Sequence, residues 1–172
     1  MKLLKWAYEK RTGRKAPYYY SFSILTIIGK PIRKFVAQVL APNCPFNNLR
    51  VLLYRICGFK IGRNVFIGMK CYLDDTCYSK MLIGNNVTIS YGVYFAAHSK
   101  DQGTFPIVIE DNVYIGMRAS VISKTKNCNV EGICIHHDSV VGACALVNCD
   151  VPAYSTAVGI PCRIIPKRCK DT

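Results

Sequence analysis

The sequence predicts an all-β chain in which short strands coil as a parallel β-helix, and three observations support this. From Ile61 onward the chain repeats itself every six residues. Each six begins with an aliphatic or aromatic residue, and the next residue is usually small or polar. Neither a helical period of 3.6 residues nor the alternation of a simple strand gives this pattern. A fixed repeat predicts stacked units that share one continuous core.

The twelve sixes divide into four groups of three, so we expect about four coils with three short sides each. The first residue of each six should point into a narrow prism, and a residue beside a corner should be small or tolerate a positive φ. The groups are "IGRNVF IGMKCY LDD", "IGNNVT ISYGVY FAAHSK", "IEDNVY IGMRAS VIS" and "IHHDSV VGACAL VNCDVP".

The departures from the repeat predict where a site is built. The coils start at Ile61, Ile83, Ile109 and Ile135, which are 22, 26 and 26 residues apart, although an unbroken coil would need only 18. The extra residues all follow the third six of a coil, so the insertions should leave the prism along one edge. Loops on a rigid scaffold commonly carry functional residues. His98 directly precedes the second insertion, "DQGTFPIV".

The positive charge of the chain is concentrated before the repeats. Residues 1–60 hold twelve Lys or Arg against one acid, whereas residues 61–172 hold eleven against nine. We expect residues 1–49 to form a basic, helical segment that covers the open edge of the first coil. Its positive charge would also suit an anionic membrane surface, so we expect the protein to work at the inner face of a membrane. We expect no nucleic acid as a partner. The stretch 18–28 is too short to span a bilayer.

The ten cysteines predict reduced thiols in a cytoplasmic protein. They have no CxxC spacing, and the first residues "MKLLKWAYEKRTGRKAP" lack the continuous apolar core of a signal peptide. Several stand where a small apolar residue would serve equally well.

The segments "IGNNVTISYGVYFAAHSKD", "IEDNVYIGMRASVIS", "VVGACALVNCDVP" and "AVGIPCRII" resemble the hexapeptide-repeat acyltransferases. The resemblance covers roughly residues 50–168, leaving 169–172 as a tail, and is closest to the galactoside- and maltose-type sugar O-acetyltransferases and their relatives in surface-polysaccharide synthesis. It implies a left-handed parallel β-helix that assembles as homotrimers, with the active site between neighbouring chains. It also implies direct acetyl transfer from acetyl-CoA to a sugar hydroxyl, without a metal.

The same resemblance implies the roles of individual residues. His98 matches the general base, and imidazole, with an ordinary pKa of about 6.5, suits that task. Asp74 and Asp75 match acids that hold the acceptor, although both also fit a turn. The residues matched to acetyl-CoA contacts are Met117, Ala143, Asn148, Arg163, Lys167 and Arg168. The chain departs from the family pattern at Met117, at His136 and at Cys149.

Four alternatives stay open from the sequence. A γ-class carbonic anhydrase would bind zinc through three histidines, but His136 and His137 are adjacent on one strand and should point to opposite faces. A non-catalytic scaffold subunit would not need the intact loop around His98. An antibiotic acetyltransferase has a similar histidine loop. A serine acetyltransferase is expected to need a longer helical segment than residues 1–49.

Overall fold

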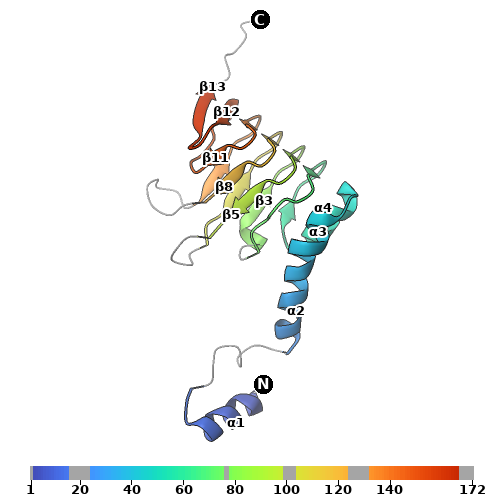
Figure 1. The fold of residues 1–172 in the computed structure, drawn as a ribbon, viewed down its shortest axis with the longest axis vertical. Coiled ribbons are helices and arrows are strands. Elements are labelled where there is room, and N and C mark those ends of the chain that lie inside the picture. The colour runs from blue at the N-terminus through green and yellow to red at the C-terminus, as the bar shows by residue number, and fades with distance from the viewer. Residues whose placement is uncertain (1, 16–23, 76–77, 99–103, 124–131, 167–172) are drawn as a thin grey trace, which may run out of the picture. The chain divides into compact units, whose positions relative to one another are not determined.

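The computed structural model describes residues 2–15, 24–75, 78–98, 104–123 and 132–166 (Figure 1). The chain separates into two compact units, residues 1–35 and 36–172. The described residues of the first unit include the helices α1 (Lys2–Thr12) and α2 (Ile24–Phe35). Within the described residues, no helix has both the length and the apolar character needed to cross a membrane.

The second unit is a coil of short strands that form three sheets. From β3 to β11, successive strands visit the three sheets in turn, and neighbouring strands within a sheet are parallel except for the last pair. The first sheet is β1 (Lys60–Ile61), β3 (Met81–Ile83), β6 (Ile107–Ile109) and β9 (Ile133–Ile135). The second is β2 (Phe66–Ile67), β4 (Thr88–Ile89), β7 (Tyr114–Ile115), β10 (Val140–Val141), β12 (Ser155–Val158) and the antiparallel β13 (Arg163–Pro166). The third is β5 (Tyr94–Ala96), β8 (Ser120–Ile122) and β11 (Leu146–Val147).

The register of the first sheet agrees with the repeat read from the sequence. Ile61 pairs with Ile83, Ile83 with Ile109, and Ile109 with Ile135. These four residues are the predicted starts of the coils, so the predicted stacking of parallel strands is confirmed. An incomplete fifth turn follows, in which β12 pairs with β10.

Inward side chains form columns along the coil, as the repeat predicted. The first position of the second six is buried in all four coils, at Ile67, Ile89, Ile115 and Val141. Burial of such apolar surface stabilises the fold by about 25 cal/mol per Å².

Asparagines and glycines occupy the corners for two different physical reasons. Asn64, Asn86 and Asn112 adopt positive φ, and their side-chain amides hydrogen-bond from coil to coil at 2.9 and 3.2 Å. Gly62 and Gly84 are not among the positive-φ residues. A Cβ on either glycine would lie 2.4 Å from an oxygen atom of the next coil. Close approach between coils, rather than backbone conformation, therefore requires these two glycines.

The open edge of the first coil is covered by helical residues that directly precede it. These elements are η2 (Val36–Leu40), α3 (Ala41–Asn43) and α4 (Asn47–Ile56). The Asn47 side chain accepts a hydrogen bond from the Ile67 N–H and donates one to the Val65 carbonyl, both at 3.0 Å. It thus imitates the peptide group of a further strand. The buried Arg50 guanidinium donates to the carbonyls of Ile67 and Cys44.

On the third side of the first coil, side chains of the preceding helical residues also hydrogen-bond to backbone carbonyls. Tyr54 Oη donates to the Cys71 carbonyl at 3.3 Å, and Gln38 Nε2 donates to the Leu73 carbonyl at 2.9 Å. Helix α4 crosses the boundary that the sequence suggested between residues 49 and 50. The capping role of residues 1–49 as a whole stays a prediction.

We predict that Asn47→Ala lowers the free energy of unfolding by about 1–3 kcal/mol, because it leaves the Val65 carbonyl and the Ile67 N–H without their partner. The measurement is the urea midpoint of the full chain. Asn48→Ala is the matched control, since Asn48 is exposed on the same helix. Equal midpoints for the two variants would contradict this account of the edge.

Candidate functional site

The candidate site lies at the corner that follows the third sheet, where the insertions leave the coil. His98 comes two residues after β5, and its backbone bridges to Thr104 across the second insertion. The Phe105 N–H donates to the Ala97 carbonyl at 2.7 Å. Lys80 Nζ donates to the Thr104 carbonyl and hydroxyl at 2.7 and 2.9 Å. His98, Thr104 and Phe105 are thus fixed to the coil on either side of residues 99–103, which lie outside the described residues.

His98 is paired with Asp74, which lies one coil earlier. The His98 Nδ1 and Asp74 Oδ2 atoms are 2.5 Å apart, and the Ala97 N–H donates to the same oxygen at 2.7 Å. The Asp74 side chain is only 1% exposed, whereas that of His98 is 45% exposed. A buried carboxylate is costly unless it is hydrogen-bonded, and these two contacts help to satisfy it. The arrangement orients an accessible imidazole.

The pairing also sets the tautomer of His98. An ionised carboxylate can only accept hydrogen bonds, so Nδ1 must carry the proton that is donated to Asp74. Nε2 then keeps its lone pair and can accept a proton from a substrate. Asp74 was predicted to hold the acceptor, and that role stays a prediction. Its carboxylate is buried against His98, where it can position the imidazole.

Asp75 lies beside two stacked tyrosines. The rings of Tyr72 and Tyr94 are parallel within 10°, with centroids 4.5 Å apart, and Tyr72 Oη lies 3.5 Å from Asp75 Oδ1. Burial, followed by the charges of Asp75 and Asp74, raises the pKa of Tyr72 to about 12. Tyr72 is therefore a neutral phenol. Sequence reasoning missed this stack, although the register that places Tyr72 opposite Tyr94 was available from the repeat.

The residues matched to acetyl-CoA lie on two sides of the third sheet. Met117 and Ala143 are exposed at the corner before this sheet, where Met117 accepts a hydrogen bond from the Cys144 N–H. Asn148 directly follows β11, at the opposite corner. Arg163 begins β13 and is exposed. These four residues therefore do not lie together within one chain.

Lys167 and Arg168, the other two residues matched to acetyl-CoA, lie outside the described residues.

The described histidines do not converge on one point. His98 contacts Asp74, His136 contacts Glu110 and His137 contacts Asp138. This arrangement does not form the three-histidine zinc site of the carbonic anhydrase alternative.

The surroundings of two cysteines, Cys71 and Cys134, do not favour catalysis by their thiols. Burial raises the pKa of Cys71, and burial together with the Glu110 and Asp150 carboxylates raises that of Cys134 to about 11. A nucleophilic cysteine needs a lowered pKa. These two thiols are therefore poor nucleophiles.

We predict that Asp74→Asn changes the tautomer population of His98, because a neutral amide can also donate to Nδ1. Nitrogen-15 NMR shifts of the imidazole in the full chain measure this population. In its neutral form, the imidazole of the native protein should show a protonated Nδ1 and an unprotonated Nε2. Asp75→Asn is the matched control and should keep the native pattern. The same tautomer in native and Asp74→Asn protein would contradict the pairing.

Comparison with proteins of known sequence finds relatives among serine acetyltransferases. The enzyme of Staphylococcus aureus strain Mu50 is 40% identical over 111 residues, and that of Bacillus licheniformis is 37% identical over 110. Both alignments cover 63% of this chain, and they cover 46% and 45% of the relatives. The chain thus matches about half the length of these relatives. No family model matches the chain.

Comparison with solved structures finds the same fold. A maltose O-acetyltransferase from Clostridium difficile 630 has a TM-score of 0.58 and 25% identity, and the match covers 92% of this chain and 95% of that one. A hexapeptide-repeat acetyltransferase from Vibrio cholerae has a TM-score of 0.57 and 23% identity, covering 84% and 93%. The resemblance to hexapeptide-repeat acetyltransferases is confirmed.

Proposed function

We infer that this chain is a member of the hexapeptide-repeat acyltransferases and that it transfers an acetyl group from acetyl-CoA to a hydroxyl oxygen. The observation that carries the proposal is the His98–Asp74 pair at the insertion edge. An accessible imidazole held by a buried carboxylate is the arrangement expected of a general base. The structure of the hexapeptide-repeat acetyltransferase from Vibrio cholerae has also been solved in complex with acetyl-CoA, and it has a TM-score of 0.55 to this chain. That complex supports acetyl-CoA as the donor.

In the proposed reaction, His98 removes the proton from the acceptor hydroxyl as its oxygen attacks the thioester carbonyl. Nε2 is the accepting atom, because Nδ1 already donates to Asp74. Asp74 stabilises the imidazolium that forms and holds the ring in place. His98 then returns the proton to the departing CoA thiolate. The bond to the acceptor oxygen forms and the carbon–sulfur bond breaks, so no enzyme nucleophile is needed.

We propose a sugar as the acceptor. The stacked Tyr72 and Tyr94 rings offer an apolar surface for the C–H face of a sugar, and the Asp75 carboxylate beside them can accept hydrogen bonds from its hydroxyl groups. The match to the maltose O-acetyltransferase over most of both chains supports the same choice. Surface polysaccharide is the acceptor class suggested by the sequence. The serine acetyltransferase relatives weigh against it and make serine the second candidate.

The proposal includes a left-handed coil and a homotrimer, both after the family. A neighbouring chain would complete the cleft at His98. It would also bring residues on the two sides of the third sheet, such as Met117 and Asn148, to one pantetheine arm. Ala143 would then line the arm, and Arg163 would contact the nucleotide phosphates with Lys167 and Arg168.

We predict that His98→Ala reduces acetyl transfer by about a hundredfold or more, which is what a general base contributes. The assay follows acetylated products by mass spectrometry, because ten cysteines would react with thiol dyes. The panel contains free sugars, sugar nucleotides and serine. His137→Ala is the matched control and should keep native activity. Equal rates for native and His98→Ala protein would remove His98 from the mechanism, and a preference for serine would replace the sugar proposal.

We also propose that residues 1–35 contact an anionic membrane and hold the protein at the inner face of that membrane. Helix α2 carries exposed Lys30 and Arg33 beside the exposed apolar side chains of Ile32 and Phe35. An amphipathic basic helix of this kind suits the headgroup region of a bilayer.

For Lys30→Gln combined with Arg33→Gln, we expect about thirtyfold weaker binding to phosphatidylserine vesicles. Each basic residue near such a surface contributes about 1 kcal/mol. Vesicle sedimentation of the full chain measures the effect. The paired change Lys60→Gln with Arg63→Gln removes the same charge from the β-helix and should bind like the native chain. Equal binding by both double variants would rule out this contact.

A further inference from the structure

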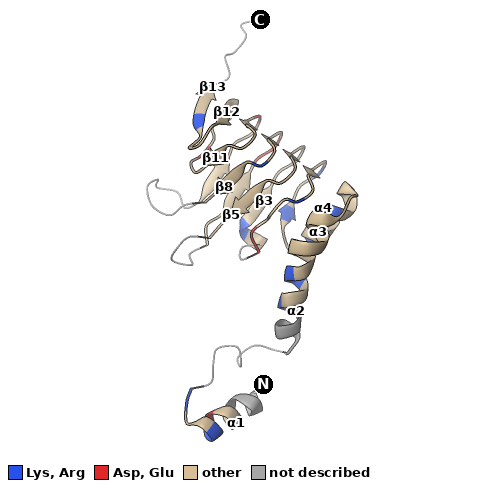
Figure 2. Cartoon of the chain, viewed as in Figure 1, with Lys and Arg blue, Asp and Glu red and all other residues tan. Residues whose placement is uncertain are grey.

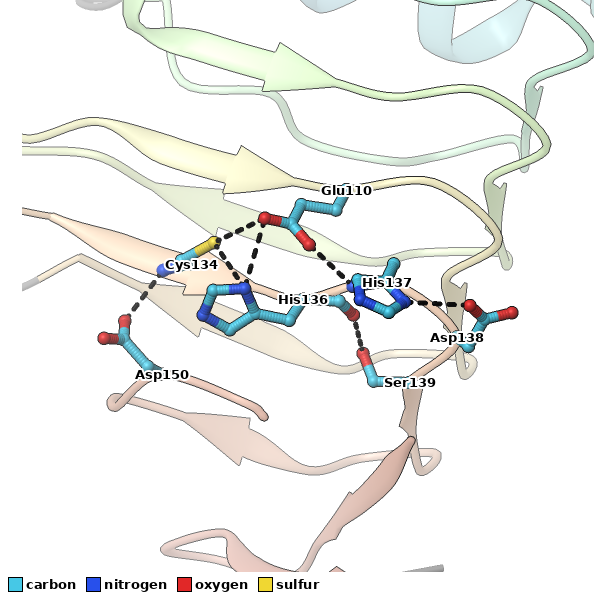
Figure 3. Close-up of polar contacts among 7 residues, drawn as sticks. All are labelled: Glu110, Cys134, His136, His137, Asp138, Ser139 and Asp150. Carbon is cyan, nitrogen blue, oxygen red and sulfur yellow. Dashed lines mark hydrogen bonds and ion pairs between the residues drawn. The ribbon is translucent and has the colours of Figure 1, made fainter. Parts of the chain in front are cut away.

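Three side chains with different ligand atoms converge on the outer face of the first sheet, away from the residues assigned above (Figure 3). They are Glu110, Cys134 and His136. The distances are 3.1 Å from His136 Nδ1 to Glu110 Oε1, 3.6 Å from His136 Nδ1 to Cys134 Sγ, and 3.8 Å from Cys134 Sγ to Glu110 Oε1. Carboxylate, thiolate and imidazole are the ligands that Zn²⁺ takes in proteins.

The register of the coil brings the three residues together. Ile133 and Ile135 point into the core, so Cys134 and His136, which alternate with them along the chain, face outward. Glu110 lies opposite His136 on the preceding coil, because Ile109 pairs with Ile135.

The residue type at the second position of each coil changes between the second coil and the third. The positions equivalent to Glu110 and His136 in the first two coils are Gly62 and Gly84, where a Cβ would meet the next coil. The third and fourth coils carry two ligand-type side chains in this column instead, and Cys134 lies beside them. The β-helix does not itself require that glycine be replaced by glutamate and histidine at these positions.

The spacing of the three atoms matches a tetrahedral metal site. With bonds of about 2.0–2.1 Å to nitrogen and oxygen and about 2.3 Å to sulfur, tetrahedral angles separate the ligand atoms by about 3.3 to 3.6 Å. The observed separations differ from this range by about 0.2 Å at most. A hydrogen bond between His136 and Glu110 would explain the shortest of them, but it would not place the sulfur at similar distances from both.

Neighbouring groups hold the ligands in place. Glu110 Oε2 accepts the His137 N–H at 2.9 Å, which leaves Oε1 directed at the cluster. The Cys134 N–H donates to Asp150 Oδ1 at 2.8 Å. The side chains of His136 and Glu110 are 42% and 35% exposed, so an ion can enter from solvent. Hydrogen bonds of this kind orient the ligands of a metal ion and raise the affinity of the site for the ion.

We propose that Glu110, Cys134 and His136 bind one Zn²⁺ ion, through Oε1, Sγ and Nδ1, and that this ion joins the third coil to the fourth. Binding displaces the thiol proton to solvent, and the fourth position of the tetrahedron stays open to water. The site shares no residue with the His98–Asp74 pair, so it does not depend on the proposed acetyl transfer. It departs from the expectation that the protein uses no metal.

The test is competition for Zn²⁺ between the full chain, freed of metal with a chelator, and a chromophoric indicator. We expect one tight site per native chain and at least about a hundredfold weaker binding by Cys134→Ser and by His136→Asn. His137→Asn and Cys149→Ser are the matched controls and should bind like the native chain. Binding that is unchanged in Cys134→Ser and His136→Asn, or the absence of a stoichiometric site in the native chain, would overturn the proposal.

Co²⁺ substitution provides a second readout that does not depend on the folding of any variant. The native chain with Co²⁺ should show a thiolate charge-transfer band in the near ultraviolet and the strong visible absorption of a four-coordinate ion. A spectrum without the thiolate band at one equivalent of Co²⁺ would also overturn the site.

Discussion

The register between coils is the constraint on which the other features of this protein depend. Each strand has only two to four residues, so no strand could fix its position alone. The column of isoleucines at 61, 83, 109 and 135 locks one coil over the next, and every outward residue follows from that alignment. A shift of one residue would turn these isoleucines outward and expose the core to water. The basic residues of the β-helix are spread over its coils (Figure 2).

The His98–Asp74 pair illustrates how a rigid coil produces a site. The two residues are 24 positions apart, yet the stack places the carboxylate directly under the imidazole. Asp74 is buried and His98 is half exposed, so the carboxylate is held inside the coil while the imidazole stays accessible to solvent. A mobile loop would have to order both groups before reaction, whereas here the coil has done so in advance.

Much of this arrangement could be predicted from the sequence, because the repeat gives register as well as fold. The coil starts, the common corner of the insertions and the place of His98 beside Asp74 all follow from counting residues. The contact of the Asp74 carboxylate with His98 did not follow, since counting places a residue at a corner without telling which way its side chain turns. The Tyr72–Tyr94 stack and the Glu110–Cys134–His136 cluster were accessible to the same counting, but His136 by itself indicates only a departure from the family pattern. The cap on the first coil depends on Asn47 and Arg50 reaching particular backbone groups, which no periodicity encodes.

The central claim is that His98 takes a proton during acetyl transfer. The most direct measurement is the rate of the His98→Ala protein in the presence of a series of free imidazoles of different pKa. His98 is accessible to solvent, so a small base can reach the space left by its ring. The account predicts that the rate rises with the concentration of unprotonated imidazole and increases with its basicity. A rate that does not respond to any imidazole would contradict the claim.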